Sequence, residues 1–108
     1  MAKLTLAESY EPVEVDLFGH DFVTTNVTRT TQIELGKLET LVDDATENQD
    51  VDKMVEALAK VLDLRLKAAD NKRTKPSTVI VQRWEADELN ILDLVKFVEE
   101  LGRASAPS

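Results

Sequence analysis

Apolar and polar residues alternate near the N-terminal end of the chain. Residues 13–17 read Val-Glu-Val-Asp-Leu, a period of two that is typical of a half-buried strand. The segment 18–21 contains a glycine and supplies turn chemistry, and residues 22–28 are rich in the β-branched side chains that favour a return strand. We therefore predict an antiparallel hairpin over roughly 13–28. Alternation over 3–6 indicates a further short edge strand.

A helical period replaces this alternation after the hairpin. The segment 31–34, Thr-Gln-Ile-Glu, matches a capping box and predicts a helix that runs to about Asp43. Gly36 weakens such a helix by about 1 kcal/mol relative to alanine, and close packing against the hairpin would explain its presence. The predicted buried face of this helix consists of Ile33, Leu38, Leu41 and Val42. Leu35 lies beside this face.

The strongest helical pattern covers residues 51–69, after a cap at Asp50 or Asn48. Its main apolar stripe consists of Val51, Met54, Val55, Leu58, Leu62 and Leu66. Its second stripe consists of Ala57, Val61, Leu64 and Ala68. Together the two stripes cover about half of the helix surface. The helix is therefore either central in a small bundle or half-exposed to a partner.

The C-terminal third predicts two more helices. Pro76 suits the first turn of a short helix, which the segment 86–89 interrupts. Asn90 can cap a last helix that ends near Leu101, and residues 103–108 are expected to form a short disordered tail. The predicted fold is α+β and mostly α, with an N-terminal antiparallel hairpin packed on about four helices in a single domain over 1–102.

Composition and charge narrow the functions that this fold could carry. The 108 residues include no cysteine and one histidine, which excludes disulfides, thiolate metal sites and multi-histidine metal sites. The formal net charge is −8, a field that repels nucleic-acid backbones. No apolar run reaches the ~18 residues that span a bilayer, and the first residues lack the apolar core of a signal peptide. We expect neither nucleic acid nor membrane as a partner.

The charge is unevenly distributed along the chain. Residues 1–50 carry eleven acids and three bases, a net −8, whereas residues 51–108 carry ten of each. Bases crowd together in the second half at Arg65, Lys67, Lys72, Arg73 and Lys75. They either complement the dipole of a helix C-terminus or contact the acidic half of another copy in a homo-oligomer.

No constellation of residues predicts catalysis or metal binding. The acidic segment 43–55 fails as a calcium loop, because neither frame places glycine at position 6 or glutamate at position 12. His20 beside Asp21 has no recognisable nucleophile and is interpreted as a turn residue. We expect no catalytic residues, no metal and no cofactor. Trp84 is either a core residue between the last two helices or an anchor at a protein interface.

The order of these elements resembles one known family. The acidic segment 13–22 is followed by helices and by the closing stretch 74–89, which contains Trp-Glu-Ala-Asp-Glu-Leu at 84–89, and then by 94–101. Over roughly residues 12–101 the chain is similar to the tail assembly chaperones of long-tailed, siphovirus-type bacteriophages, especially those of actinobacterial hosts. The resemblance implies a non-catalytic protein of the host cytoplasm. Such proteins bind the tape measure protein while tail tube protein polymerises around it.

The family carries no catalytic motif, so the binding residues are predicted from the sequence alone. The candidates for partner binding are Val61, Leu64, Ala68, Arg73, Lys75, Arg83 and Trp84. Two other classes compete with the chaperone: a structural head–tail connector or tail terminator protein, and a small acidic adaptor protein. A connector or terminator would remain in finished particles, whereas a chaperone would not.

Overall fold

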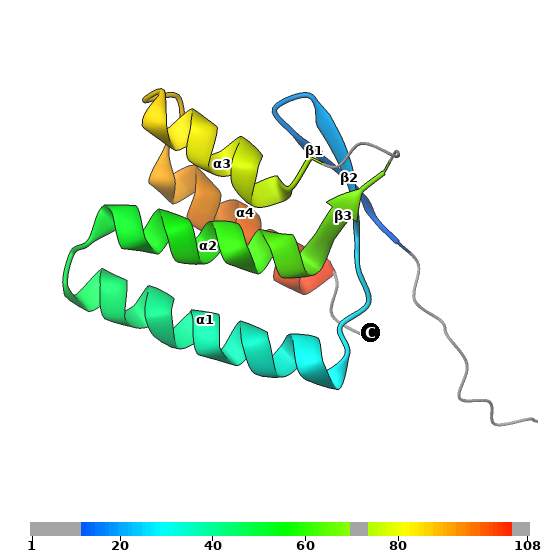
Figure 1. The fold of residues 1–108 in the computed structure, drawn as a ribbon, viewed down its shortest axis with the longest axis horizontal. Coiled ribbons are helices and arrows are strands. Elements are labelled where there is room, and N and C mark those ends of the chain that lie inside the picture. Colours follow the sequence, from blue (N-terminus) through cyan, green and yellow to red (C-terminus); the bar gives the residue numbers. More distant parts are fainter. Residues whose placement is uncertain (1–11, 70–73, 105–108) are drawn as a thin grey trace, which may run out of the picture.

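A computed structural model describes residues 12–69 and 74–104, of which residues 103 and 104 are described by their backbone alone. Figure 1 shows that the two longest helices run antiparallel, that the later helices pack on the second of them, and that a small sheet lies at one end. In chain order the elements are β1 (Glu14–Leu17), β2 (His20–Thr24), α1 (Arg29–Glu47), α2 (Val51–Arg65), β3 (Leu66–Ala68), α3 (Pro76–Glu85) and α4 (Ile91–Ala104). The predicted α+β, mostly α class is confirmed.

The predicted hairpin is present, with a shorter turn and a shorter return strand. β1 and β2 pair antiparallel, and Leu17 lies opposite His20, so that Phe18 and Gly19 alone form the turn. His20 is therefore an exposed strand residue next to the turn rather than a turn residue. The return strand ends at Thr24, and the Thr25 amide donates to the Arg65 carbonyl at 2.8 Å. The strand predicted over 3–6 lies outside the described residues.

The helix predicted over 51–69 is wrong in its last turn. Residues 66–68 form β3 instead, which pairs antiparallel with β2 and completes a sheet of order β1-β2-β3. A two-stranded hairpin is marginally stable in water, and the third strand satisfies the second edge of β2. Leu66 is buried in the strand, and the helical pattern also placed it on a buried face, so the apolar period alone does not separate helix from strand here.

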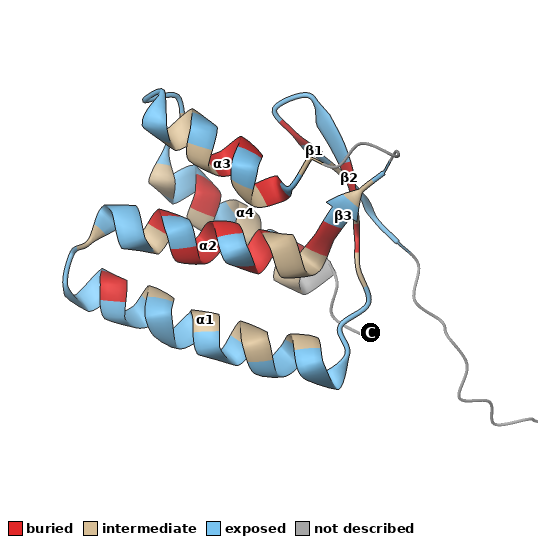
Figure 2. Ribbon diagram, in the orientation of Figure 1, coloured by how far each residue is buried: buried red, intermediate tan, exposed pale blue. Residues whose placement is uncertain are grey.

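The first helix begins earlier and is less buried than its sequence predicts. Its cap is Thr28, whose hydroxyl accepts from the Thr31 amide, so the predicted capping box at 31–34 is wrong. Ile33 and Leu41 are 46% and 51% exposed, contrary to the predicted buried face. A side chain at Gly36 would meet open space, so packing on the hairpin does not explain this glycine. In Figure 2, α1 is exposed along most of its length, and it packs mainly on α2.

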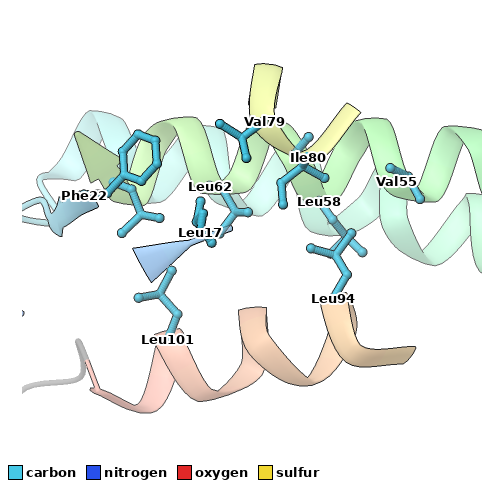
Figure 3. Packing of buried hydrophobic residues seen from close by; sticks show 11 residues of the cluster. Leu17, Phe22, Val55, Leu58, Leu62, Val79, Ile80, Leu94 and Leu101 are labelled. Carbon is cyan, nitrogen blue, oxygen red and sulfur yellow. The ribbon is translucent and has the colours of Figure 1, made fainter. Parts of the chain in front are cut away.

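The hydrophobic core lies on the side of α2 that faces away from α1. Phe22 from β2, Leu62 from α2 and Ile80 from α3 are almost fully buried there. Figure 3 shows side chains from β1, β2, α2, α3 and α4 converging on this core. Its buried members are Leu17, Phe22, Val55, Leu58, Ala59, Leu62, Leu66, Val79, Ile80, Leu94 and Leu101.

The second apolar stripe of α2 is also covered. Ala57 and Val61 are buried but do not belong to the core cluster, and α1 packs along this side of α2. Of the two alternatives for this helix, a central position in the bundle is therefore the correct one.

The closing helices follow the sequence closely, apart from the C-terminus. Pro76 begins α3, whose next amide, that of Ser77, donates to the Asp63 carboxylate at 2.9 Å and ties α3 to α2. Asn90 precedes α4 and accepts through its side chain from the Leu92 amide. α4 continues to Ala104, beyond its predicted end near Leu101, so residues 103 and 104 are helical rather than part of the predicted disordered tail. Residues 105–108 lie outside the described part.

Candidate protein-binding surface

An open groove separates the β1–β2 turn from the α3–α4 connection. Its volume is about 390 Å³. Leu17, Ile80 and Leu94 are its buried residues and also belong to the core, where Figure 3 shows them close together. The rest of the lining is half-buried or exposed and consists of Asp16, Phe18, Glu88, Leu89, Asn90, Asp93 and Phe97. We call this surface the Phe18 groove.

Phe18 holds a backbone conformation that its residue type disfavours. Its φ is +52° and that of Gly19 is +88°. Positive φ at both central residues is the requirement of a type I′ turn, for which Asn-Gly is the preferred sequence. A bulky residue in this region is strained, and retained strain of this kind concentrates at functional positions. The residue is nonetheless 43% exposed, so burial does not account for the strained backbone.

Arg83 links the two walls of the groove. Its guanidinium carbon lies 4.6 Å from the centre of the Phe18 ring, and one of its nitrogens lies 2.7 Å from Glu88 Oε2. The Glu88 amide also donates to the Arg83 carbonyl at 2.9 Å. A cation stacked on an aromatic face at an exposed site contributes about 0.5–1 kcal/mol. Arg83 thus favours the observed orientation of the Phe18 ring at the rim.

The rim of the Phe18 groove is acidic. Asp16, Glu88 and Asp93 line it, and these three carboxylates face one neighbouring basic residue, Arg83, which is paired with Glu88. One oxygen of Asp16 accepts from the Gly19 amide at 2.7 Å, which holds this carboxylate at the turn. The groove therefore combines an apolar floor with a rim that favours cations.

Two other hollows lack this combination. The space between α1 and α2 measures about 520 Å³, and its lining mixes Lys53 and Lys60 with Asp44, Asp50 and Glu56. A third hollow, at β3 and the start of α3, measures about 390 Å³ and holds lysines at 67 and 75 with an aspartate at 63. Neither presents several large apolar side chains on an acidic rim.

The residues predicted for partner binding do not form one surface in the structure. Val61 is only 8% exposed and is a packing residue, so its predicted role at a surface is wrong. Leu64 is half-buried, and its carbonyl accepts from the Thr25 hydroxyl at 2.7 Å. Ala68 in β3 and the exposed Lys75 line the third hollow. Arg73 lies outside the described residues.

The remaining two predicted residues point in different directions from α3. Arg83 stands at the Phe18 groove, as described above. Trp84 is half-buried against the core, and its indole nitrogen donates to Asp52 at the start of α2, at 2.8 Å. The structure places Trp84 in the packing between α3 and α2, in agreement with a core role but with α2 rather than α4 as its hydrogen-bonding partner.

Sequence reasoning missed Phe18, Leu89, Asp93 and Phe97 as residues of one surface. A signal was present at one of them, because phenylalanine directly before Gly19 occupies a turn position where asparagine is preferred. The other three lie more than 70 residues away along the chain, and only the fold brings them to the turn.

Nothing in the described residues suggests a metal centre. No group of three or more histidine, aspartate or glutamate side chains in this part of the chain could hold a metal ion. Buried side-chain nitrogen and oxygen atoms of the described residues all have hydrogen-bond partners. Among the described helices, none has the length and apolar character needed to cross a bilayer. Comparison with protein-family models, curated proteins and solved structures finds no match.

Proposed function

We propose that this protein is a non-catalytic tail assembly chaperone of a siphovirus-type bacteriophage. It acts in the host cytoplasm, where it binds tape measure protein and tail tube protein during tail assembly. The observation that supports this proposal is the Phe18 groove, an open apolar surface with an acidic rim. The resemblance of segments 13–22 and 74–101 to the chaperone family supplies the identity of the partners.

The physical properties of the chain suit such a role. A tape measure protein is a long helical chain whose apolar faces would aggregate before the tube surrounds them. A shallow groove covers few apolar side chains at a time, so binding is reversible and release can follow tube growth. The net charge of −8 on each copy of this chain favours solubility through repulsion between copies.

Co-expression with the neighbouring tape measure protein tests this function. We expect the tape measure protein to be soluble and to co-purify when this chain is present, and to be insoluble when it is absent. Mass spectrometry of purified particles provides the second readout. Detection of this chain in finished virions would favour a head–tail connector or tail terminator, and stable binding to a single non-tail protein would favour an adaptor.

A further inference from the structure

We infer that the Phe18 groove binds an amphipathic α-helix whose apolar residues are flanked by lysine or arginine. The inference deepens the proposed function and rests on it, since the helix would belong to the partner that the chaperone protects. It names a partner chemistry and a surface, neither of which follows from the sequence resemblance.

The apolar part of the partner is indicated by the floor of the groove. Leu89 and Phe97 are half-buried, and Phe18 is largely exposed, around a floor formed by buried residues. A volume of about 390 Å³ lies within the ~300–1,000 Å³ typical of ligand pockets. Two apolar side chains one helical turn apart could fill it, as in other helix-in-groove interfaces.

A helix fits this surface better than an extended strand. An extended peptide needs unpaired backbone groups on its host, whereas a helix satisfies its own backbone hydrogen bonds. Several backbone amides at or next to the groove already have partners: Gly19 donates to Asp16, Leu92 to the Asn90 side chain and Leu94 to the Asn90 carbonyl. The lining presents apolar side chains from both walls of the groove, which one face of an amphipathic helix can cover.

The charge of the partner is indicated by the rim. Glu88 is already paired with Arg83, whereas Asp16 and Asp93 have no lysine or arginine beside them in the groove lining. A basic residue on either side of the apolar pair would meet these two carboxylates. Arg83 already lies against Phe18 and Glu88, so Asp16 and Asp93 are the carboxylates left for the partner's basic residues. An acidic helix would be repelled.

Three synthetic peptides of about 18 residues, long enough to form a helix, provide the probe. The basic peptide carries two leucines four residues apart with lysines around them. The acidic peptide replaces those lysines with glutamates, and the polar peptide keeps the lysines but replaces the leucines with glutamines. Binding to the purified full chain is measured by fluorescence anisotropy of labelled peptide. We expect the basic peptide to bind at least about tenfold more tightly than either other peptide.

Paired variants locate the binding. Phe18→Asn removes the ring and suits the positive φ, and its control is Leu92→Asn, a residue that is 72% exposed and does not line the groove. Asp93→Lys reverses a rim charge, and its control is Glu99→Lys, an exposed residue of the same helix outside the groove. We expect each groove variant to weaken the basic peptide about tenfold or more, and each control to change it less than about twofold. Circular dichroism confirms that all four variants fold.

The outcomes separate this inference from the proposed function. Equal binding of the basic and polar peptides, or equal loss in groove and control variants, would overturn the groove as a helix-binding site. If Phe18→Asn still keeps the tape measure protein soluble in co-expression, the chaperone function stands and the groove assignment falls. If the basic peptide binds at the groove but the tape measure protein is never solubilised, the groove assignment stands and the proposed function falls.

Discussion

The two sides of α2 are built in different ways. On one side, β1, β2, α3 and α4 interlock around Leu62 and Ile80 and bury large side chains from each element. On the other side, α1 contributes a single buried residue, Ala45, and leaves Ile33 and Leu41 exposed. The first side combines a fixed core with a strained turn at its edge. The second side is a covering helix that shields α2 while adding little to the core.

This difference teaches where stability and binding are concentrated in the molecule. A surface that must hold a partner needs side chains kept in place by packing beneath them. The Phe18 groove meets this requirement, because its floor residues are also core residues. α1 lacks such support, although it exposes apolar side chains of similar size.

The largest effect is expected when the same leucine-to-alanine substitution is made in the core and in α1. Leu62→Ala removes a fully buried side chain and leaves a cavity, so we expect it to lower the free energy of unfolding by about 2–5 kcal/mol. Leu41→Ala is the matched control. It shortens the side chain of a residue that is 51% exposed, so the free energy of unfolding should change by less than about 1 kcal/mol. Urea denaturation followed by circular dichroism measures both. Similar losses in the two variants would contradict the asymmetry.

A second prediction concerns local opening. α1 is held mainly by α2 and has few buried side chains, so it should open without unfolding the rest of the domain. Amide hydrogen exchange under native conditions should show faster exchange in the middle of α1 than in the middle of α2. Equal protection of the two helices would mean that α1 unfolds only with the core.

The turn offers a smaller effect in which two contributions oppose each other. Phe18→Asn relieves a strained backbone, worth about 1–2 kcal/mol, and loses the stacking of Arg83 on the ring, worth about 0.5–1 kcal/mol. The net change in unfolding free energy should therefore stay within about 1 kcal/mol. Thermal unfolding of the variant tests this. A loss above about 3 kcal/mol would show that the ring supports the fold rather than a partner.

The smallest effect is expected at an ion pair on α1. The Lys37 ammonium lies 3.2 Å from a Glu34 carboxylate oxygen, and the two side chains are 68% and 47% exposed. Lys37→Ala should change stability by less than about 0.5 kcal/mol, and any loss should shrink further at high salt. Urea denaturation at low and high salt gives the comparison. A larger, salt-insensitive loss would mean that α1 contributes more than its burial indicates.

The helix boundaries that depend on a few neighbouring residues could be predicted from the sequence. Asp50 as a cap, Pro76 at the start of α3, the interruption at 86–89 and Asn90 before α4 each depend on a few neighbouring residues, and each is confirmed. β3 could not be predicted, because Leu66 continues the i, i+4 spacing of Leu58 and Leu62. Its strand conformation depends on pairing with β2, more than 40 residues earlier in the chain.

The candidate surface was less predictable than the fold. Periodicity assigned Ile33 and Leu41 to a buried face, but the helix turns other residues toward α2. Periodicity also offered Val61 for binding, although α1 covers that side of α2. The sequence indicates Arg83 only through its residue type beside a tryptophan, whereas its contact with Phe18 depends on how the fold brings α3 to the β1–β2 turn.

Chemical-shift mapping on the isotopically labelled full chain tests the central claim most directly. The protein is titrated with the basic amphipathic peptide, and the amide signals are followed by two-dimensional NMR. The account predicts that the shifted amides cluster at the β1–β2 turn, the α3–α4 connection and the first turns of α4. Shifts that cluster along α1 instead, or that spread evenly over the acidic surface, would contradict it.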